Sequence, residues 1–532
     1  MIYDTIIVGA GSAGCVLADR LTRSGRRSVL LLESGPPDRN RLIHMPRGFG
    51  RTLVDGDLTW VYAARKTGGH DEPEYWVRGR VLGGSSSVNG MVYVRGQPSD
   101  YDGWQEIGCQ GWGWQDMKAA FLALEDHELG ASPLRGSGGP LKVTLHPVRQ
   151  PLCEAMLNGA AGLGLPRVDD LNAIDDVGIG YQPRTIWRGR RQSAATAFLA
   201  PARRRSNLTV ETGVEVLRVL FEGRRVIGVR AKTPQGERDI AARQVILSAG
   251  ALNSPLLLQR SGIGDPDHLR SLGIPVVAPA SEVGRNLQEH RTLIAQFRLK
   301  RGSENHLFRG LGLARSLTNY ALAGRGPLTA AAFEVGGFIR TEPGQGRPDA
   351  QIGMGPISVD RSKPGFHLEH SPGALCGGYV MRPESKGHIS ITSPDPNAPA
   401  DIDPNYLATD YDRRVSVGLF RFIRALFAQP QLAPYVESES IPGTAIETDD
   451  EIIEAFHGIG FAGLHAAGTC RMGSDGNSVV DTALRVRGVE GLRVVDISVM
   501  PSLVSGNTNA PAMAIGWRAA DFIDADGSAG RA

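Results

Sequence analysis

The sequence has few cysteines and no long apolar run. Its five cysteines, at positions 15, 109, 153, 376 and 470, form no C-x-x-C pair. An odd number in this pattern is typical of a reducing compartment and predicts no metal site. No stretch reaches the roughly 20 apolar residues that span a bilayer, and the first predicted strand begins at residue 3, which leaves no room for a signal peptide. We therefore expect a cytoplasmic protein without an integral membrane segment.

The chain also has little net charge. It contains 58 Lys and Arg residues against 56 Asp and Glu residues, a formal net charge of +2. This balance does not favour nucleic acid or a membrane surface as the main partner, because both attract strongly basic proteins. With 532 residues and 68 glycines, the chain is long for one core and fits a loop-rich α/β protein with two or more lobes.

A glycine-rich turn follows the first predicted strand, Asp4–Val8. This short, β-branched run is typical of a strand buried on both faces. Gly9, Gly11 and Gly14 then form G-x-G-x-x-G without a spacer. The first glycine permits the tight turn, the second lets backbone N–H groups approach a pyrophosphate, and the third lets the next helix lie close to the strand.

A second predicted strand, Val29–Leu32, ends in an acid. Glu33 follows Gly14 by nineteen residues. A carboxylate at this place accepts hydrogen bonds from the two hydroxyls of an adenosine ribose and repels a 2′-phosphate. Strand, helix, strand and acid together predict a dinucleotide site.

Two later segments also have the residue types of a ligand site. Gly79–Gly96 is a glycine–serine turn whose small residues and free N–H groups suit phosphates and a flat ring; an ordinary loop is the alternative. The length of the passage 36–78 before it predicts loops that extend over a bound ligand. Its Trp60 either borders that ligand or packs in the core. Near the C-terminus, a buried strand at 491–501 contains Asp496, an acid placed to contact a sugar-like chain.

Residues 300–455 differ in sequence pattern from the segments before them. They combine strand-like alternation at 387–392, Pro-rich turns at 394–404 and amphipathic helices near 411–428 and 449–457. We expect the main part of a second lobe here, inserted between pieces of the first. In the first lobe, a returning strand that ends at Gly250 leads into a helix, for which Pro255 is predicted as the first residue.

Together these segments resemble the glucose–methanol–choline (GMC) oxidoreductase family, FAD enzymes that mostly oxidise alcohols. The resemblance spans Asp4 to Ile523, and residues 79–102 and 250–264 are similar to the family's two signature segments. It is the resemblance that indicates FAD rather than NAD. It implies an α/β, Rossmann-like FAD-binding domain and a discontinuous α+β substrate-binding domain built on an antiparallel sheet. The expected boundaries are 1–150, 190–300 and 456–532 for the first domain, and 151–189 and 301–455 for the second.

The resemblance also implies which residues hold FAD. The ADP half would be held by Gly9, Gly11, Ser12, Ala13, Gly14 and Glu33. The pyrophosphate and isoalloxazine would lie along Val81, Gly83, Gly84, Ser87, Val88, Asn89, Gly90, Met91 and Val92. The adenine would meet Val214, the phosphates would lie near Ala249, and the ribityl chain and pyrimidine edge would lie beside Asp496 and Thr508.

In this resemblance, His465 matches the family's active-site His and Asn509 matches its partner. A His is suited to take the hydroxyl proton, because its ordinary pKa of about 6.5 leaves it neutral near pH 7. The amide of Asn509 can donate to the developing alkoxide. We expect a structural or flavin-shell role for His290 and a packing role for Cys470, and Glu334 is a candidate to face the substrate.

Two positions differ from family members that oxidise choline. Some of those enzymes attach FAD covalently through a His where this chain has Val88, so FAD is expected to be non-covalent here. They also tend to carry an aromatic residue before the active-site His, as part of a cage for the quaternary ammonium. This chain has Leu464 there, which makes an uncharged alcohol the expected substrate.

The expected function is FAD-dependent oxidation of a primary alcohol to its aldehyde, with electrons passing to O2 or another acceptor. Aromatic and furan-type alcohols are candidates, because the pattern around 507–509 resembles 5-hydroxymethylfurfural oxidases and choline-dehydrogenase-like enzymes. The alternatives are a choline dehydrogenase and a lyase like hydroxynitrile lyase, which shares the scaffold without net redox change. The sequence does not distinguish an oxidase from a dehydrogenase.

Overall fold

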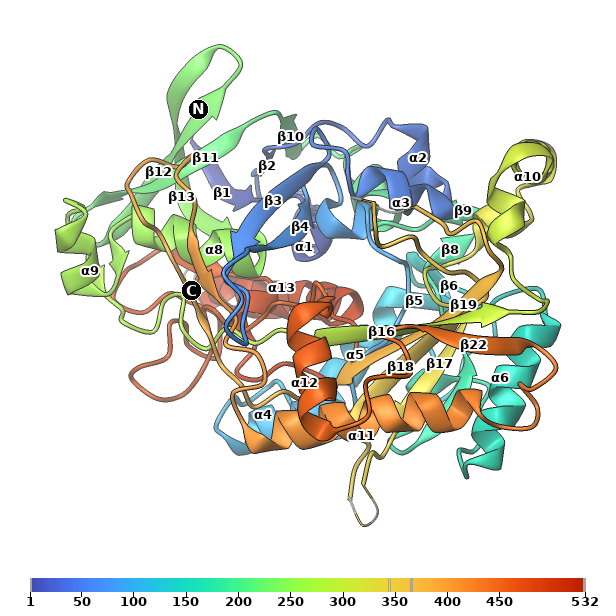
Figure 1. Cartoon of the computed structure of the whole chain (residues 1–532). Helices are drawn as coiled ribbons and strands as arrows, with labels where there is room; N and C mark the ends of the chain where they lie inside the picture. Colours follow the sequence, from blue (N-terminus) through green and yellow to red (C-terminus); the bar gives the residue numbers. More distant parts are fainter. Residues whose placement is uncertain (1, 343, 345, 364–366, 530–532) are drawn as a thin grey trace.

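Strand β1 (Tyr3–Val8) lies inside a seven-stranded sheet. It pairs in parallel with β2 (Val29–Glu33) on one side and with β13 (Gly236–Leu247) on the other. The computed structural model describes residues 2–342, 344, 346–363 and 367–529 (Figure 1). The other strands of the first sheet are β10 (Leu208–Thr212), β11 (Glu215–Glu222), β12 (Arg225–Thr233) and β24 (Leu492–Val494).

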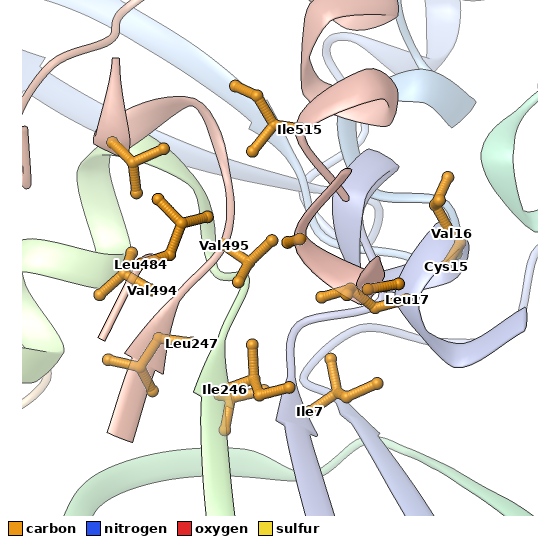
Figure 2. Close-up of a cluster of buried hydrophobic side chains, with 14 of the residues drawn as sticks. Ile7, Cys15, Val16, Leu17, Ile246, Leu247, Leu484, Val494, Val495 and Ile515 are labelled. Atoms are coloured by element: carbon orange, nitrogen blue, oxygen red, sulfur yellow. The ribbon is translucent and has the colours of Figure 1, made fainter. Parts of the chain in front are cut away.

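A buried hydrophobic cluster joins this sheet to helices α1 (Ser12–Thr22) and α13 (Asn509–Ala529) (Figure 2). Ile7 of β1 and Ile246 of β13 are fully buried, as are Val16 of α1 and Ile515 of α13. Burying one side chain of this size stabilises the fold by roughly 1.5–3 kcal/mol. The cluster therefore holds the C-terminal helix against the N-terminal strand–helix unit, so the two ends of the chain build one core.

The second sheet is antiparallel and is covered by helices on one face. Its strands run in the order β22 (Val436–Ile441), β16 (Arg291–Leu299), β19 (Gly373–Val380), β18 (Ala350–Gly355), β17 (Val335–Ile339) and β7 (Gly178–Tyr181), and β23 (Phe461–Ala462) also pairs with β16. Helix α11 (Asp410–Phe427) packs on β19 and α6 (Pro151–Gly162) on β17, with α12 (Asp449–Gly458) against α11 (Figure 1). The predicted fold class is confirmed.

The second sheet takes strands from both sets of predicted segments. Strand β16 lies before residue 300 and β23 lies after residue 456, both in segments expected to belong to the FAD-binding domain. The expected boundaries therefore cut through this sheet. Strand β23 pairs with β16 and leads directly into the turn 463–466, which contains the predicted base His465, so this turn is joined to the second sheet.

The helix that contains Pro255 begins earlier than the sequence predicts. Helix α8 runs from Gly250 to Arg260, so Pro255 lies inside it and is not its first residue. Proline has no N–H and leaves the carbonyl four residues earlier without its helical partner. Here Thr469 Oγ1 donates to that carbonyl, the oxygen of Ala251, at 2.6 Å. A contact from a distant part of the chain thus offsets the usual penalty of a proline inside a helix.

Among the described residues, no helix is both long and apolar enough to cross a membrane. The remaining elements are mostly short, and one of them, the helix Trp114–Leu124, packs on α13 in the first core. These elements are α2 (Arg41–His44), α3 (Phe49–Thr52), β3 (Thr59–Ala64), β4 (Glu74–Gly79), α4 (Pro98–Glu106), α5 (Trp114–Leu124), β5 (Glu125–His127), β6 (Leu141–Val143), β8 (Ile186–Trp187), β9 (Arg190–Arg191), α7 (Ala200–Ala202), β14 (Ile263–Gly264), α9 (Pro266–Ser271), β15 (Ala278–Pro279), α10 (Gly310–Ala323), β20 (His388–Ser390) and β21 (Asp401–Asp403).

The buried cluster gives a test of the first sheet. Ile246→Ala removes a fully buried side chain, and such truncations lower the free energy of unfolding by about 2–5 kcal/mol. Ile227→Ala on β12 is the matched control, because Ile227 is 43% exposed. Urea unfolding followed by circular dichroism should show a clearly lower midpoint for Ile246→Ala only. Equal midpoints for the two variants would contradict the assigned core.

Candidate active site

One cavity brings the predicted cofactor residues and His465 together. Its volume is about 810 Å³, and residues of both sheets line it. Two sets of charged residues line the cavity: the acidic Glu33, Glu215, Asp395 and Asp496, and the basic Arg78, Arg80, Lys232 and Arg260. The wall extends from the end of β2 to the turn at His465.

The glycine turn after β1 has the close contacts that its spacing predicts. Gly9 has a φ of +100°, and a Cβ there would meet the carbonyl oxygen of Ser248 at 2.5 Å. A Cβ on Gly14 would meet the carbonyl oxygen of Gly9 at 2.0 Å, so only glycine lets α1 approach the turn this closely. Gly11, Ser12 and Ala13 line the cavity, whereas Gly14 does not. The N-terminus of α1 thus faces the cavity, where its free N–H groups and dipole favour an anion.

Glu33 lies at the end of β2, as predicted, with its carboxylate fixed by the backbone. Its Oε2 accepts from the N–H of Ala10 at 3.0 Å and its Oε1 from the N–H of Gly35 at 2.9 Å. Burial raises the pKa of Glu33, and these N–H groups oppose that shift. Glu33 and Val214 both line the cavity, and the N–H of Val214 donates to the carbonyl of Glu33. The carboxylate is therefore positioned for a ribose and Val214 for a neighbouring base.

The second glycine turn packs directly on the first. The N–H of Gly83 donates to the carbonyl of Ala10 at 2.8 Å, and a Cβ on Gly84 would meet the Cα of Gly11 at 2.7 Å. Among the predicted residues, the structure brings Gly84, Val88, Asn89, Gly90, Met91 and Val92 to the cavity wall. Val81, Gly83 and Ser87 are not among the lining residues and shape the turn; for example, Ser87 Oγ donates to the carbonyl of Leu82 at 2.7 Å.

Asp496 organises the end of the cavity between the two glycine turns and the catalytic turn. Its Oδ2 accepts from the N–H of Gly250 at 2.9 Å and from Ser254 Oγ at 2.6 Å. Burial raises the pKa of Asp496, and these hydrogen bonds oppose that shift. Asp496, Ala249 and Thr508 all line the cavity. Glycine cradles, a helix N-terminus and buried carboxylates at these places fit a dinucleotide cofactor.

His465 lies in a turn that a buried carboxylate holds. The backbone N–H groups of His465, His290 and Ala466 all donate to the carboxylate of Glu289, at 2.7, 2.9 and 2.8 Å. Leu464, just before His465, has a φ of +64°, a conformation that is unfavourable for leucine. The three hydrogen bonds stabilise this conformation, and the Arg78 guanidinium, 3.3 Å from Glu289 Oε2, partly balances the buried charge.

The protonation of His465 follows from its neighbours. His290 Nε2 lies 2.9 Å from the carbonyl of Met381, which only accepts, so a neutral His290 carries its proton there. His290 Nδ1 then accepts from His465 Nδ1, at 2.9 Å, and His465 Nε2 keeps its lone pair. Burial lowers the pKa of His290 to about 3. Burial, His290 and Arg78 hold the pKa of His465 well below its usual range. His465 is therefore a neutral base whose Nε2 carries no proton.

The structure corrects the predicted partner of His465. Asn507, not Asn509, lies against it, with Asn507 Nδ2 3.1 Å from His465 Nε2. Gln351 Nε2 donates to Asn507 Oδ1 at 3.2 Å, which turns the Asn507 amide N–H groups toward His465. Asn509 Oδ1 instead accepts from Ser12 Oγ at 2.7 Å, because Asn509 begins α13 and that helix packs on α1.

The other candidates occupy different places. Trp60 lines the cavity, with Arg80 over its ring at 4.6 Å. Glu334 is not among the lining residues; it is buried 3.5 Å from Arg47 and accepts from Cys153 Sγ at 3.6 Å. Burial raises the pKa of the Cys470 thiol well above its usual range, as expected for a packing residue.

Several residues of the site were missed from the sequence. Gln351 and Tyr379 come from strands of the second sheet, and Glu289 and Arg78 lie behind or beside the catalytic turn. Nothing in their local sequence marks them. The sequence did point to Asn507, because one asparagine stands on each side of Thr508. The structure was needed to choose between the two, because α13 begins at Asn509.

The comparisons with known proteins agree with this geometry. Residues 3–292 match the N-terminal part, and residues 383–516 the C-terminal part, of the family described as GMC oxidoreductase. "Choline dehydrogenase, mitochondrial" of Homo sapiens is 42% identical, over 98% of this chain and 89% of that protein. "Alcohol dehydrogenase [acceptor]" of Pseudomonas putida is 37% identical, over 98% of this chain and 96% of that protein.

A solved structure agrees in fold over the same length. Pyridoxine 4-oxidase from Mesorbium loti superposes with a TM-score of 0.88 and 33% sequence identity, covering 98% of both chains. The relatives and the shared fold thus extend over both sheets, and the two family matches cover the first sheet and the ends of the second. The chain belongs to the GMC oxidoreductase family.

Proposed function

We propose that this protein oxidises a primary alcohol to the aldehyde, with His465 as the base. The observation that carries the proposal is the neutral His465, whose Nε2 carries no proton and which lines the same cavity as the dinucleotide-binding turns. Relatives named choline dehydrogenase, alcohol dehydrogenase (acceptor) and pyridoxine 4-oxidase support it. A lyase on the same scaffold would need no oxidation of its substrate, so bleaching of the flavin by alcohol under argon separates the two.

The cofactor is FAD, as in the GMC oxidoreductases. We expect Glu33 to hold its ribose, the N-terminus of α1 and the turn at Gly84 its pyrophosphate, and the segment 88–92 its ring. When bound, FAD accepts the hydride from the alcohol carbon. The lining residues of the cavity include a single His, His465, and no Cys. Val88 cannot bond to a flavin, so this position offers no covalent anchor.

The residues of the chain hold the alcohol and its proton. His465 Nε2 would accept the hydroxyl proton while its Nδ1–H stays bonded to His290 Nδ1, which keeps the ring in place. The amide N–H of Asn507 lies beside that Nε2 and would donate to the oxygen as negative charge develops there. Gln351 keeps the Asn507 amide in this orientation. The base and the donor thus act on one oxygen atom.

A second candidate substrate is choline. The observation in its favour is the 42% identity to the human protein named choline dehydrogenase. Leu464 stands against it, since it replaces the aromatic residue expected before the active-site His. The electron acceptor, O2 or another, is decided by following peroxide release and dye reduction together. We also keep a cytoplasmic location as a proposal, because all five cysteines are free and buried; cell fractionation tests it.

The first prediction concerns the attachment of FAD. Because Val88 cannot bond to a flavin and the segment 79–96 contains no His or Cys, FAD should be non-covalent. Acid precipitation of the purified protein should leave the yellow colour in the supernatant, as measured by absorption near the flavin maximum. A pellet that remains yellow would contradict this.

The second prediction separates the two asparagines. His465→Ala should retain FAD yet slow its anaerobic reduction by alcohol roughly 10²–10⁴-fold, the usual loss of a general base. Asn507→Ala should slow reduction by about 10²-fold, as for a lost oxyanion donor. Asn509→Ala should instead weaken retention of FAD, because Asn509 bonds Ser12 at the N-terminus of α1.

Stopped-flow measurements at matched FAD content make this comparison. Asn509→Ala is the matched control for Asn507→Ala, since each variant removes an asparagine side-chain amide and the two positions lie two residues apart in the chain. A slower reduction in Asn509→Ala than in Asn507→Ala would restore the pairing expected from the sequence. An unchanged rate in His465→Ala would place the base elsewhere.

The third prediction concerns pH. Burial raises the pKa of Glu289 to about 7, so its carboxylate is ionised above that pH and protonated below it. Protonation removes an acceptor from the N–H groups that hold the His465 turn, so the reduction rate should fall as pH drops through about 7. The pKa of His465 lies well below 6.5, so His465 adds no inflection between pH 7 and 9. In Glu289→Gln the inflection should disappear; its persistence would assign it to another group.

A further inference from the structure

Helix α10 (Gly310–Ala323) has its apolar residues on the side that faces solvent. It lies at the edge of the molecule, away from both sheets (Figure 1), and packs on the 3-10 helices η5 (Asn305–Phe308) and η6 (Pro327–Thr329). Its buried residue is Ser316, whose hydroxyl donates to the carbonyl of Leu307 at 2.9 Å. A surface helix ordinarily buries its apolar side and exposes its polar side, so α10 has the reverse arrangement.

The exposed residues of α10 share one side of the helix. Leu311, Ala314, Thr318 and Leu322 recur at spacings of three and four residues, which places them together and opposite Ser316. Leu311 is 91% exposed and Leu322 is 84% exposed. Leucine side chains exposed to this extent along one helix mark a surface that contacts another molecule or a membrane.

The hairpin 186–191, formed by β8 and β9, extends this surface at the C-terminal end of α10. A Cβ on Gly189 would meet the carbonyl oxygen of Gly324 at 2.2 Å, so the turn of the hairpin packs directly on the residue that ends the helix. Burial raises the pKa of Tyr320 on α10, and the nearby Arg190 opposes that shift. The hairpin adds Trp187, which is 38% exposed. Tryptophan is enriched where proteins meet the headgroup region of a membrane.

The exposed charges of this surface, which we name the α10 surface, are basic. They are Arg188, Arg190, Arg315 and Arg325. Residues 186–191 and 305–333 contain no Asp or Glu, and no ion pair among the described residues involves these four arginines. Near the N-terminal end of α10, Arg309 donates to the backbone carbonyl of Glu369, so one acid lies there beside a fifth arginine. The excess of positive charge favours an anionic partner.

We infer that the α10 surface docks this protein on an anionic lipid bilayer. Leu311 and Leu322 would enter the boundary between headgroups and acyl chains, and Arg315, four residues after Leu311, would stay at the level of the phosphates. The arginines beside the helix would add electrostatic attraction to anionic lipids. This binding is peripheral, since α10 lies flat on the surface and does not span it.

A second copy of the chain fits the α10 surface less well. A two-fold axis brings the same surface of both copies together, so arginines would face arginines without carboxylates between them. The net charge of +2 for the whole chain does not reveal the docking surface, because acidic residues elsewhere offset its arginines. The attraction falls off within about 10 Å at 0.1 M salt, so the local charge decides the binding.

Vesicle binding by the FAD-loaded enzyme tests the inference without any alcohol, so its outcome does not depend on the proposed function. The protein is sedimented with vesicles of phosphatidylcholine alone, or of equal parts of phosphatidylcholine and phosphatidylglycerol. Leu311→Ser/Leu322→Ser removes the apolar contacts. Its matched control is Ile107→Ser/Ile227→Ser, because Ile107 and Ile227 are exposed isoleucines outside the surface.

A second pair of variants tests the charges. Arg315→Gln/Arg325→Gln removes two arginines of the α10 surface, and Arg218→Gln/Arg224→Gln is the matched control, because these two exposed arginines belong to β11 and the turn after it. All substituted residues are exposed, so the variants should keep the wild-type circular dichroism spectrum and FAD content. The apolar and charge variants are independent, so one suffices if the other does not fold.

The wild type should sediment with the anionic vesicles and not with phosphatidylcholine alone, and high salt should release it. The partition coefficient should fall roughly 10–100-fold in Leu311→Ser/Leu322→Ser and roughly 10–30-fold in Arg315→Gln/Arg325→Gln. Both controls should bind as the wild type does.

Three results would overturn the inference. The first is a wild type that sediments with neither vesicle, or with both alike. The second is equal binding by the α10 variants and their controls. The third is a dimer of the wild type, seen by analytical ultracentrifugation, that Leu311→Ser/Leu322→Ser dissociates, because this would assign the α10 surface to a second copy of the chain.

Discussion

A single buried carboxylate, that of Glu289, fixes the turn that contains the proposed base His465. Glu289 accepts from the N–H groups of His290, His465 and Ala466, and it contacts Arg78 of strand β4. It stands just before β16, so it ties the His465 turn to the sheet that forms the cavity wall. Without it, buried N–H groups would lack acceptors and the strained turn at Leu464 would lose its support. The distance between base and wall therefore depends on this one group.

The part of the site that could be predicted from the sequence is local. Gly9, Gly14 and Glu33 belong to one strand–helix–strand unit, whose geometry follows directly from residue spacing. Their close contacts and hydrogen bonds have the predicted form. The fold class followed from the family resemblance, which spans both lobes.

The rest depends on contacts between distant segments. Asn507 meets His465 because α13 begins at Asn509 and directs the preceding residues to the cavity. Pro255 is accepted inside α8 because Thr469, far along the chain, donates to the carbonyl that it leaves free. The pairing of Gln351 with Tyr379, and of Leu293 with Gly378, exists only in the register of three strands. Spacing along the chain contains none of these relations, so local patterns could not reveal them.

The site separates its chemistry from its specificity. The proposed base, His465, follows β23, and its donor Asn507 precedes α13. The wall beside them comes from strands of the second sheet. Identity to a protein named choline dehydrogenase therefore argues for the shared scaffold and chemistry more strongly than for the substrate. The lining residues that come from β16, β18 and β19 include no acidic residue, and we propose that this part of the wall contributes to the choice of alcohol.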